Sequence, residues 1–171
     1  MFKFLEKIRD KGVWYSLILK ALDLRHPDNP EKRLYSSEVN AFFIIAKALM
    51  YLSGNEVNGF KAEIAEIIKH VDKWGMGEYN KKIILDFLKS TEKIQIPDAF
   101  ATGGCAGTWS DKDSIRYTIA LIEIANADGE YNSKERLLIE NIMRFFRASD
   151  AEIAKFTDDV LSIIDENKKA A

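Results

Sequence analysis

Hydrophobic residues recur every three or four positions along nearly the whole chain, and alternating runs of strand length are absent. Positions three and four apart share one face of a helix, so this pattern predicts an all-α protein. The three prolines all fall between predicted helices. We expect about seven helices. The first is an N-terminal helix within residues 1–25, bent near Gly12 and reaching Leu24. The others are expected over 37–53, 58–74 and 78–91, from 110 to a turn at 128, from 132 onward, and from 149 to 167.

Residues that favour helix ends stand at these boundaries. Gly54 and Gly75 can adopt the left-handed conformation that closes a helix. A polar side chain at the first boundary position can accept a hydrogen bond from the free backbone N–H groups of the first turn. Three such caps are expected, two of them with the Glu of a capping box: Ser110, Asn132 with Glu135, and Ser149 with Glu152.

Two of the helices show apolar stripes that we expect to face the core. They are Ile83, Ile84, Phe87 and Leu88 in the helix over 78–91, and Ile115, Ile119, Ile122 and Ala125 in the helix from 110.

The order of helices and turns repeats along the chain. Helix starts in residues 110–167 lie about 72 to 74 positions after their counterparts in residues 37–92, with a one-residue slip in the turn. We interpret this as a diverged three-helix duplication within a single domain, 1–171, packed around a pseudo-twofold core with the N-terminal helix on one side. The alternative is a chance likeness between two helical hairpins.

Composition excludes several classes of protein. Apolar residues make up 47% and charged residues 30% of the chain, a balance typical of globular proteins and not of disordered ones. The net charge of −2 does not provide the basic field that nucleic-acid binding needs. No apolar run reaches membrane-spanning length, and the charged N-terminal residues do not form a secretory signal. A lone cysteine, Cys105, cannot form an internal disulfide, so we expect a cytoplasmic location.

The richest chemistry lies in the turn before the helix from 132. Asp128, Glu130, Asn132 and Glu135 place three carboxylates and an amide within eight residues. Oxygen ligands of this kind suit Ca²⁺ or Mg²⁺. The spacing is not that of an EF-hand, because a loop starting at Asp128 would have Ile139 at its last ligand position. The alternative is purely structural, with Gly129 making the turn and Asn132 and Glu135 the cap.

This turn, with its partner around Gly54, resembles those of the TerB-like tellurite-resistance proteins. The resemblance lies in a small-residue helix that ends in an Asp-Gly turn, Ala125-Asn126-Ala127-Asp128-Gly129, and is followed by a Glu-bearing cap, and it covers about residues 37 to 165. These are all-helical bacterial stress proteins built as two similar halves. The resemblance implies a cytoplasmic, non-enzymatic protein with an acidic surface, which binds a divalent metal and acts with protein partners, membrane-associated ones among them.

The first copy departs from this pattern. It has Ser53-Gly54-Asn55 without an aspartate, and Lys61 stands where the second copy has Glu135. Only Asp128, Glu130 and Glu135 therefore carry over as expected metal ligands, with Ca²⁺ or Mg²⁺ as the expected ion.

Three alternative functions remain, and two of them rest on patterns in the N-terminal part of the sequence. His26-Pro27-Asp28 is the tripeptide with which J-domain co-chaperones engage Hsp70, although Pro27 and Asp28 also read as an ordinary helix stop and turn. The apolar face of the N-terminal helix can lie on a membrane or, more simply, against the core. A helical adaptor that binds no ion is the third alternative.

Two clusters offer weaker chemistry. Glu63, Glu66 and His70 share one helix face at spacings suited to a metal, but His70 is also explained by its place near a helix C-terminus. The small-residue loop over 103–108 holds Cys105 but lacks the ending of a phosphate-binding loop, and we interpret it as a joint between the halves.

Overall fold

The computed structural model describes residues 22–26, 37–90, 107 and 109–171. Within these ranges the protein is all-α, as predicted, and no residue belongs to an extended strand. The expected helix over residues 2–21 and the loop that holds Cys105 lie outside the described residues. The described elements are α2 (Ser37–Ser53), the 3-10 turn η1 (Glu56–Asn58), α3 (Lys61–Lys73), α4 (Gly77–Lys89), α6 (Asp111–Ala125), α7 (Ser133–Phe145) and α8 (Asp150–Ala170).

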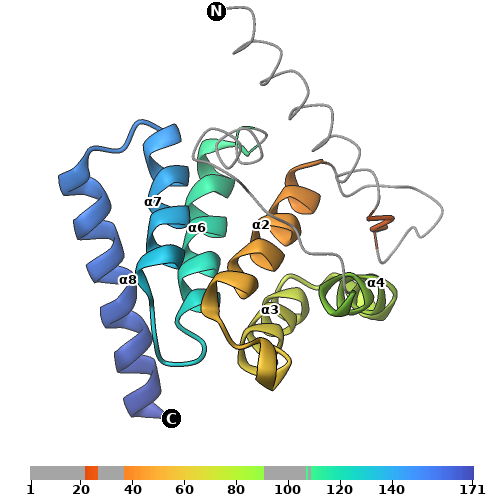
Figure 1. Cartoon of the computed structure of the whole chain (residues 1–171). Coiled ribbons are helices and arrows are strands. Elements are labelled where there is room, and N and C mark those ends of the chain that lie inside the picture. Colours follow the sequence, from red (N-terminus) through yellow and green to blue (C-terminus); the bar gives the residue numbers. More distant parts are fainter. Residues whose placement is uncertain (1–21, 27–36, 91–106, 108) are drawn as a thin grey trace, which may run out of the picture.

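Helix α2 lies at the centre of the molecule (Figure 1). It packs against α6 and α7, while α3 packs against α4 and α6, and α8 covers α6 and α7 from the other side. Every residue from Asn40 to Met50 is buried. A helix that is apolar on all sides is stable only inside a protein, which explains why α2 has neighbours all round. The internal duplication stays a prediction.

The end of α2 was predicted correctly from its glycine, and the start of α3 was not. Gly54 has a φ of +76° at the end of α2, and Gly75 has a φ of +63° just after α3. Helix α3 begins at Lys61 and not at Asn58, because Gly59 and Phe60 both have left-handed φ values, +62° and +52°. These two residues cannot be part of a right-handed helix, so η1 ends before α3 starts.

Residues 22–25 are not helical, which corrects the expected extension of the N-terminal helix to Leu24. Leu22 and Leu24 are buried, and the Asn80 side chain of α4 holds the backbone of this segment. Asn80 Oδ1 accepts a hydrogen bond from the Arg25 N–H at 2.7 Å, and Asn80 Nδ2 donates to the Arg25 carbonyl. An amide that supplies both a donor and an acceptor replaces the hydrogen bonds of a helix at this position.

The apolar stripe of α4 is confirmed, and that of α6 is partly wrong. Ile84 and Leu88 of α4 are buried. On α6, Ile122 and Ala125 are buried, but Ile115 is 56% exposed. The buried face of α6 is rotated toward α2, because Tyr117 packs among the rings of Phe42, Trp74 and Trp109 with centroids 5.0 to 5.6 Å away.

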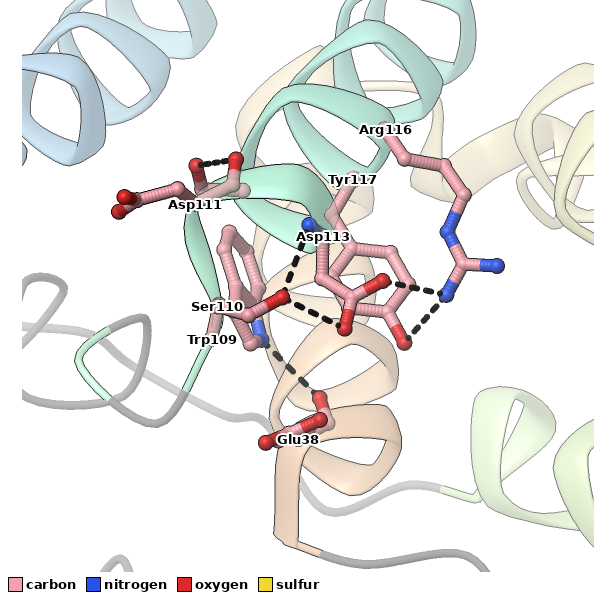
Figure 2. A network of polar contacts seen from close by, with 8 residues as sticks. Glu38, Trp109, Ser110, Asp111, Asp113, Arg116 and Tyr117 are labelled. Carbon is pink, nitrogen blue, oxygen red and sulfur yellow. Dashed lines mark hydrogen bonds and ion pairs between the residues drawn. The ribbon is translucent and has the colours of Figure 1, made fainter.

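A polar network fixes the start of α6 on α2 (Figure 2). Trp109 Nε1 donates to the Glu38 carbonyl at 3.0 Å, and Ser110 Oγ accepts from the Asp113 N–H at 3.2 Å. Asp113 in turn pairs with Arg116, whose guanidinium also reaches the Tyr117 hydroxyl at 3.1 Å. The predicted caps at Ser110, Asn132 and Ser149 are all confirmed, the last two as complete capping boxes.

Removing the Ser110 cap should weaken this network measurably. We expect Ser110→Ala to lower the free energy of unfolding by about 1 kcal/mol, since the Asp113 N–H loses its acceptor. Urea unfolding followed by circular dichroism measures the change, with the exposed Ser162→Ala in α8 as the matched control. Equal stability of the two variants would contradict a capping role.

None of the described helices combines the length and the apolar character needed to cross a membrane.

Candidate functional site

Two turns from distant parts of the sequence meet at one end of the molecule (Figure 1). The first connects α2 to α3, and the second connects α6 to α7. Asn132 Nδ2 of the second turn donates to the Leu52 carbonyl at the end of α2, at 3.0 Å. Asn55 Nδ2 of the first turn donates to Asp128 Oδ2 of the second, at 2.6 Å. We call Asn55, Glu63, Asp128 and Glu135, which gather here, the acidic junction.

The first turn delivers Glu63 to the junction. The left-handed residues Gly59 and Phe60 redirect the chain so that Glu63 stands in the first turn of α3. Glu63 is only 1% exposed, and its Oε1 accepts a hydrogen bond from Asn55 Nδ2 at 2.6 Å. The free N–H groups at a helix start favour a carboxylate, which offsets part of the cost of burying this charge.

The second turn delivers Asp128 and Glu135. Asp128 Oδ1 accepts from the Glu130 N–H at 2.9 Å, and Gly129 takes the left-handed conformation with a φ of +90°. Glu135 Oε2 accepts from the Asn132 N–H at 2.9 Å, while Asn132 Oδ1 accepts from the Glu135 N–H at 3.0 Å. This reciprocal capping box holds the Glu135 carboxylate at the start of α7.

The junction holds more negative charge than its hydrogen bonds satisfy. Glu135 is fully buried, and its Oε1 has no hydrogen-bond partner; the same is true of Glu63 Oε2. Burial, assisted by the nearby carboxylates of Asp128, Glu63 and Glu130 and opposed by the Asn132 N–H, raises the pKa of Glu135 to about 7. A buried carboxylate that lacks a nearby positive charge or enough hydrogen-bond donors favours its neutral, protonated form.

The structure separates the three expected ligands. Asp128 and Glu135 both belong to the junction, Asp128 exposed and Glu135 buried, whereas Glu130 is exposed and its backbone N–H donates to Asp128 Oδ1. Among the described residues, neither Asp128, Glu130 and Glu135 nor the junction carboxylates Glu63, Asp128 and Glu135 form a group whose three ligand atoms all lie within 4.8 Å of one another. Glu63 is a better candidate ligand than Glu130, because the Glu63 and Asp128 carboxylates both accept hydrogen bonds from the Asn55 amide.

Glu63 was missed as a partner of Glu135. The comparison of the two turns matched Lys61 with Glu135, and Glu63 was assigned to a face with Glu66 and His70. The available signal was that Glu63 and Glu135 are both the third residue of the helix that follows each turn. The two turns have the same length, seven residues each (54–60 and 126–132), so an offset of 72 pairs these two glutamates, whereas matching Gly54 with Gly129 requires an offset of 75 and hides the correspondence.

The junction gathers side-chain oxygen atoms of the kind that hard cations prefer as ligands. The Asn55 amide nitrogen lies 2.6 Å from both Glu63 Oε1 and Asp128 Oδ2. Rotation of this amide by half a turn would direct Oδ1 toward the same two carboxylates, an arrangement that is favourable only with a cation between them. Asn55 can therefore serve as a hydrogen-bond donor without an ion and as a ligand with one.

The other sequence hypotheses concern residues that the structure describes only in part. Pro27 and Asp28 of the co-chaperone tripeptide lie outside the described residues, as does Cys105. Of the suggested Glu63, Glu66 and His70 set, Glu63 joins the acidic junction, whereas Glu66 and His70 lie beside Glu123 of α6.

No family model, no curated protein and no solved structure matches this chain.

Proposed function

We propose that this protein is a TerB-like stress-response protein that binds a hard divalent cation, Ca²⁺ or Mg²⁺, at the acidic junction and has no catalytic activity. One observation carries the proposal. Two fully buried carboxylates, Glu63 after the first turn and Glu135 after the second, each keep an oxygen without a hydrogen-bond partner beside Asp128.

The energetics favour an ion at this position. A buried unpaired carboxylate costs several kcal/mol, so the folded protein must either take up a proton or bind a cation. A divalent cation neutralises two carboxylates at once. The junction offers carboxylate oxygens as ligands, and rotation of the Asn55 amide adds its Oδ1. A set of oxygen ligands suits hard cations better than softer transition metals.

Such an ion would connect the two parts of the chain. Its ligands come from the turn after α2, the start of α3 and the turn after α6, so binding would hold the two turns together. Exposed groups flank the place, notably Glu130 and Val57, which is 99% exposed. We propose that this cation-ordered surface engages a protein partner in the cytoplasm, as the TerB resemblance implies, including a membrane-associated partner.

A calorimetric titration tests the cation site. At about pH 8, where Glu135 is ionised, we expect Ca²⁺ or Mg²⁺ to bind saturably and to raise the melting temperature with the logarithm of its concentration. Asp128→Asn and Glu63→Gln should each weaken binding by roughly tenfold or more, since each removes a charge that faces the ion.

Asp150→Asn is the matched control for charge. Asp150 is an exposed aspartate beyond the far end of α7, a helix that spans roughly 20 Å from the capping box at Asn132. Its removal should leave binding unchanged. Absence of heat with both ions, or equal affinity in wild type and Asp128→Asn, would refute the proposed function.

A further inference from the structure

A second group of metal-ligand side chains lies between α3 and α6. Glu66 and His70 stand one turn apart on α3, and Glu123 faces them from α6. His70 Nε2 lies 3.2 Å from Glu123 Oε2 and 3.6 Å from Glu66 Oε1. Among the described residues, this is the group of three whose ligand atoms all lie within 4.8 Å of one another.

His70 is held rigidly and directed into this group. The residue is 3% exposed, and its ring lies against Trp74 with the centroids 5.5 Å apart. Its buried Nε2 makes no hydrogen bond of normal geometry, although two carboxylate oxygens lie close to it. A buried ring nitrogen that two carboxylates approach but do not satisfy is the arrangement expected of a metal ligand without its ion.

The distances suit a transition metal. With bonds of about 2.0 to 2.2 Å and tetrahedral angles, two ligand atoms on Zn²⁺ lie about 3.3 to 3.6 Å apart. The separations of 3.2 and 3.6 Å from His70 Nε2 bracket this range. The Glu66 and Glu123 side chains are 19% and 25% exposed, so small rotations can bring their oxygens into place.

We propose that Glu66, His70 and Glu123 form a second metal site, specific for a divalent transition metal such as Zn²⁺, which links α3 to α6. An imidazole with two carboxylates suits Zn²⁺ and its neighbours in the first transition row better than Ca²⁺ or Mg²⁺. This site is separate from the acidic junction. Glu63 lies in the first turn of α3, whereas His70 lies in the last, roughly 10 Å further along the helix.

The surroundings leave room for a further ligand. The three side chains line a hollow of about 530 Å³, and Ile163 and Ile164 of α8 also contribute to its lining. Three protein ligands leave a fourth coordination position open, which water or an external anion can fill. Lys69 Nζ now lies 3.2 Å from Glu66 Oε1, and because its side chain is 69% exposed, an incoming metal displaces it at little cost.

Cobalt and zinc titrations of the full chain test this site. In a Cys105→Ser background, which removes the one thiol, we expect one equivalent of Co²⁺ to give a visible absorption band that Zn²⁺ abolishes. Glu123→Gln and Glu66→Gln should each weaken Zn²⁺ binding by roughly tenfold or more. His70→Gln should remove the cobalt band.

The chain offers a matched control, since His26 and His70 are its two histidines. His26→Gln should bind Zn²⁺ as the wild type does, and so should Asp128→Asn, which disables the acidic junction alone. If His70→Gln fails to fold, the two partly exposed glutamate variants decide the question. Absence of saturable Zn²⁺ binding, or unchanged affinity in Glu123→Gln, would overturn the proposal and leave the acidic junction unaffected.

Discussion

Lys47→Ala should lower the free energy of unfolding by about 3 to 5 kcal/mol, the largest effect that we expect from one substitution. Lys47 is a fully buried lysine on α2. Its Nζ donates to the Phe87 carbonyl at 2.7 Å, to the Ser90 carbonyl at 3.3 Å and to Ser90 Oγ at 2.5 Å. The ammonium also lies 4.6 Å from the centroid of the Phe87 ring.

These contacts make Lys47 the cap of α4. The last carbonyl groups of a helix lack partners within it and carry partial negative charge, which a cation stabilises. Alanine would remove the lysine donor from the Ser90 carbonyl and from the Phe87 carbonyl, which keeps the Ser90 N–H and hydroxyl as donors, and would open a cavity where the lysine stem lies. Both effects act in the same direction.

Two further variants separate these effects when guanidinium unfolding is measured. Lys47→Met keeps most of the volume and loses only the donors, so it should lose about half as much stability as alanine, of order 1 to 3 kcal/mol. Lys82→Ala changes an exposed lysine on the same α4 and should alter stability little. If Lys47→Ala lowers the free energy of unfolding by less than about 1 kcal/mol, the buried lysine does not contribute substantially to stability.

Features encoded locally were predictable from the sequence. Glycines and capping residues act on their own helix ends, so α2 ends at Ser53 before Gly54, and the caps at Ser110, Asn132 and Ser149 are where they were expected. The buried lysine was not predictable in this way. Its partners belong to another helix, and nothing in the sequence near Lys47 marks it as buried except its apolar neighbours.

The errors arose where tertiary contacts override local preference. Ile115 fits the apolar stripe of α6 but faces outward, because the large rings packed around Tyr117 set the rotation of that helix. Residues 22–25 have a helical pattern but are not helical, and the Asn80 side chain holds the backbone of Arg25 instead.

The candidate sites show the same division. Asp128 and Glu135 were identified from one short segment. Glu123, in contrast, meets His70 only because α3 packs against α6, and Glu63 meets Asp128 only through the contact between the two turns. Residues 63 and 135 are 72 positions apart, the same offset that separates the starts of α3 and α7, but matching the glycines Gly54 and Gly129 requires 75 and conceals this pairing. Which side chains of different helices lie together depends on the tertiary fold, and the sequence pattern of each helix alone does not predict it.

Glu135→Gln should stabilise the metal-free protein at about pH 8 by about 2 to 3 kcal/mol, although it removes the carboxylate of a capping box. Glutamine keeps an oxygen that can accept the Asn132 N–H, so the capping box persists. What disappears is a fully buried negative charge beside Glu63 and Asp128.

The pH dependence follows from the direction of the pKa change. Burial raises the pKa of Glu135 from its ordinary 4.5 to about 7, so between these values the folded protein binds more protons than the unfolded chain does. The wild type therefore loses stability as pH rises from about 4.5 to about 7, and the loss is complete above that range. Glutamine does not titrate, so the advantage of the variant should vanish below about pH 4.5.

Glu152→Gln is the matched control, because Glu152 occupies the same capping position at the exposed start of α8. The Ser149 backbone N–H lowers the pKa of Glu152, so this carboxylate is favourable when ionised, and its replacement should act in the opposite direction. Thermal unfolding of both variants from about pH 4 to 9 measures the contrast. A Glu135→Gln variant less stable than wild type at about pH 8 would show that the carboxylate is compensated in the folded protein.

Added cation should reverse the order of stability between Glu135→Gln and the wild type. An ion in the acidic junction compensates the charge of Glu135 and so removes the penalty that the substitution avoids. Saturating Ca²⁺ or Mg²⁺ should thus stabilise the wild type at about pH 8 and leave Glu135→Gln nearly unchanged, because the variant offers one charge less to the ion. Binding should also release a proton near pH 7, where Glu135 is half protonated, and calorimetry in buffers of different ionisation enthalpy detects that release. Proton release in the wild type together with its absence in Glu135→Gln would tie the ion to this carboxylate, whereas equal stabilisation of both proteins would place the ion elsewhere.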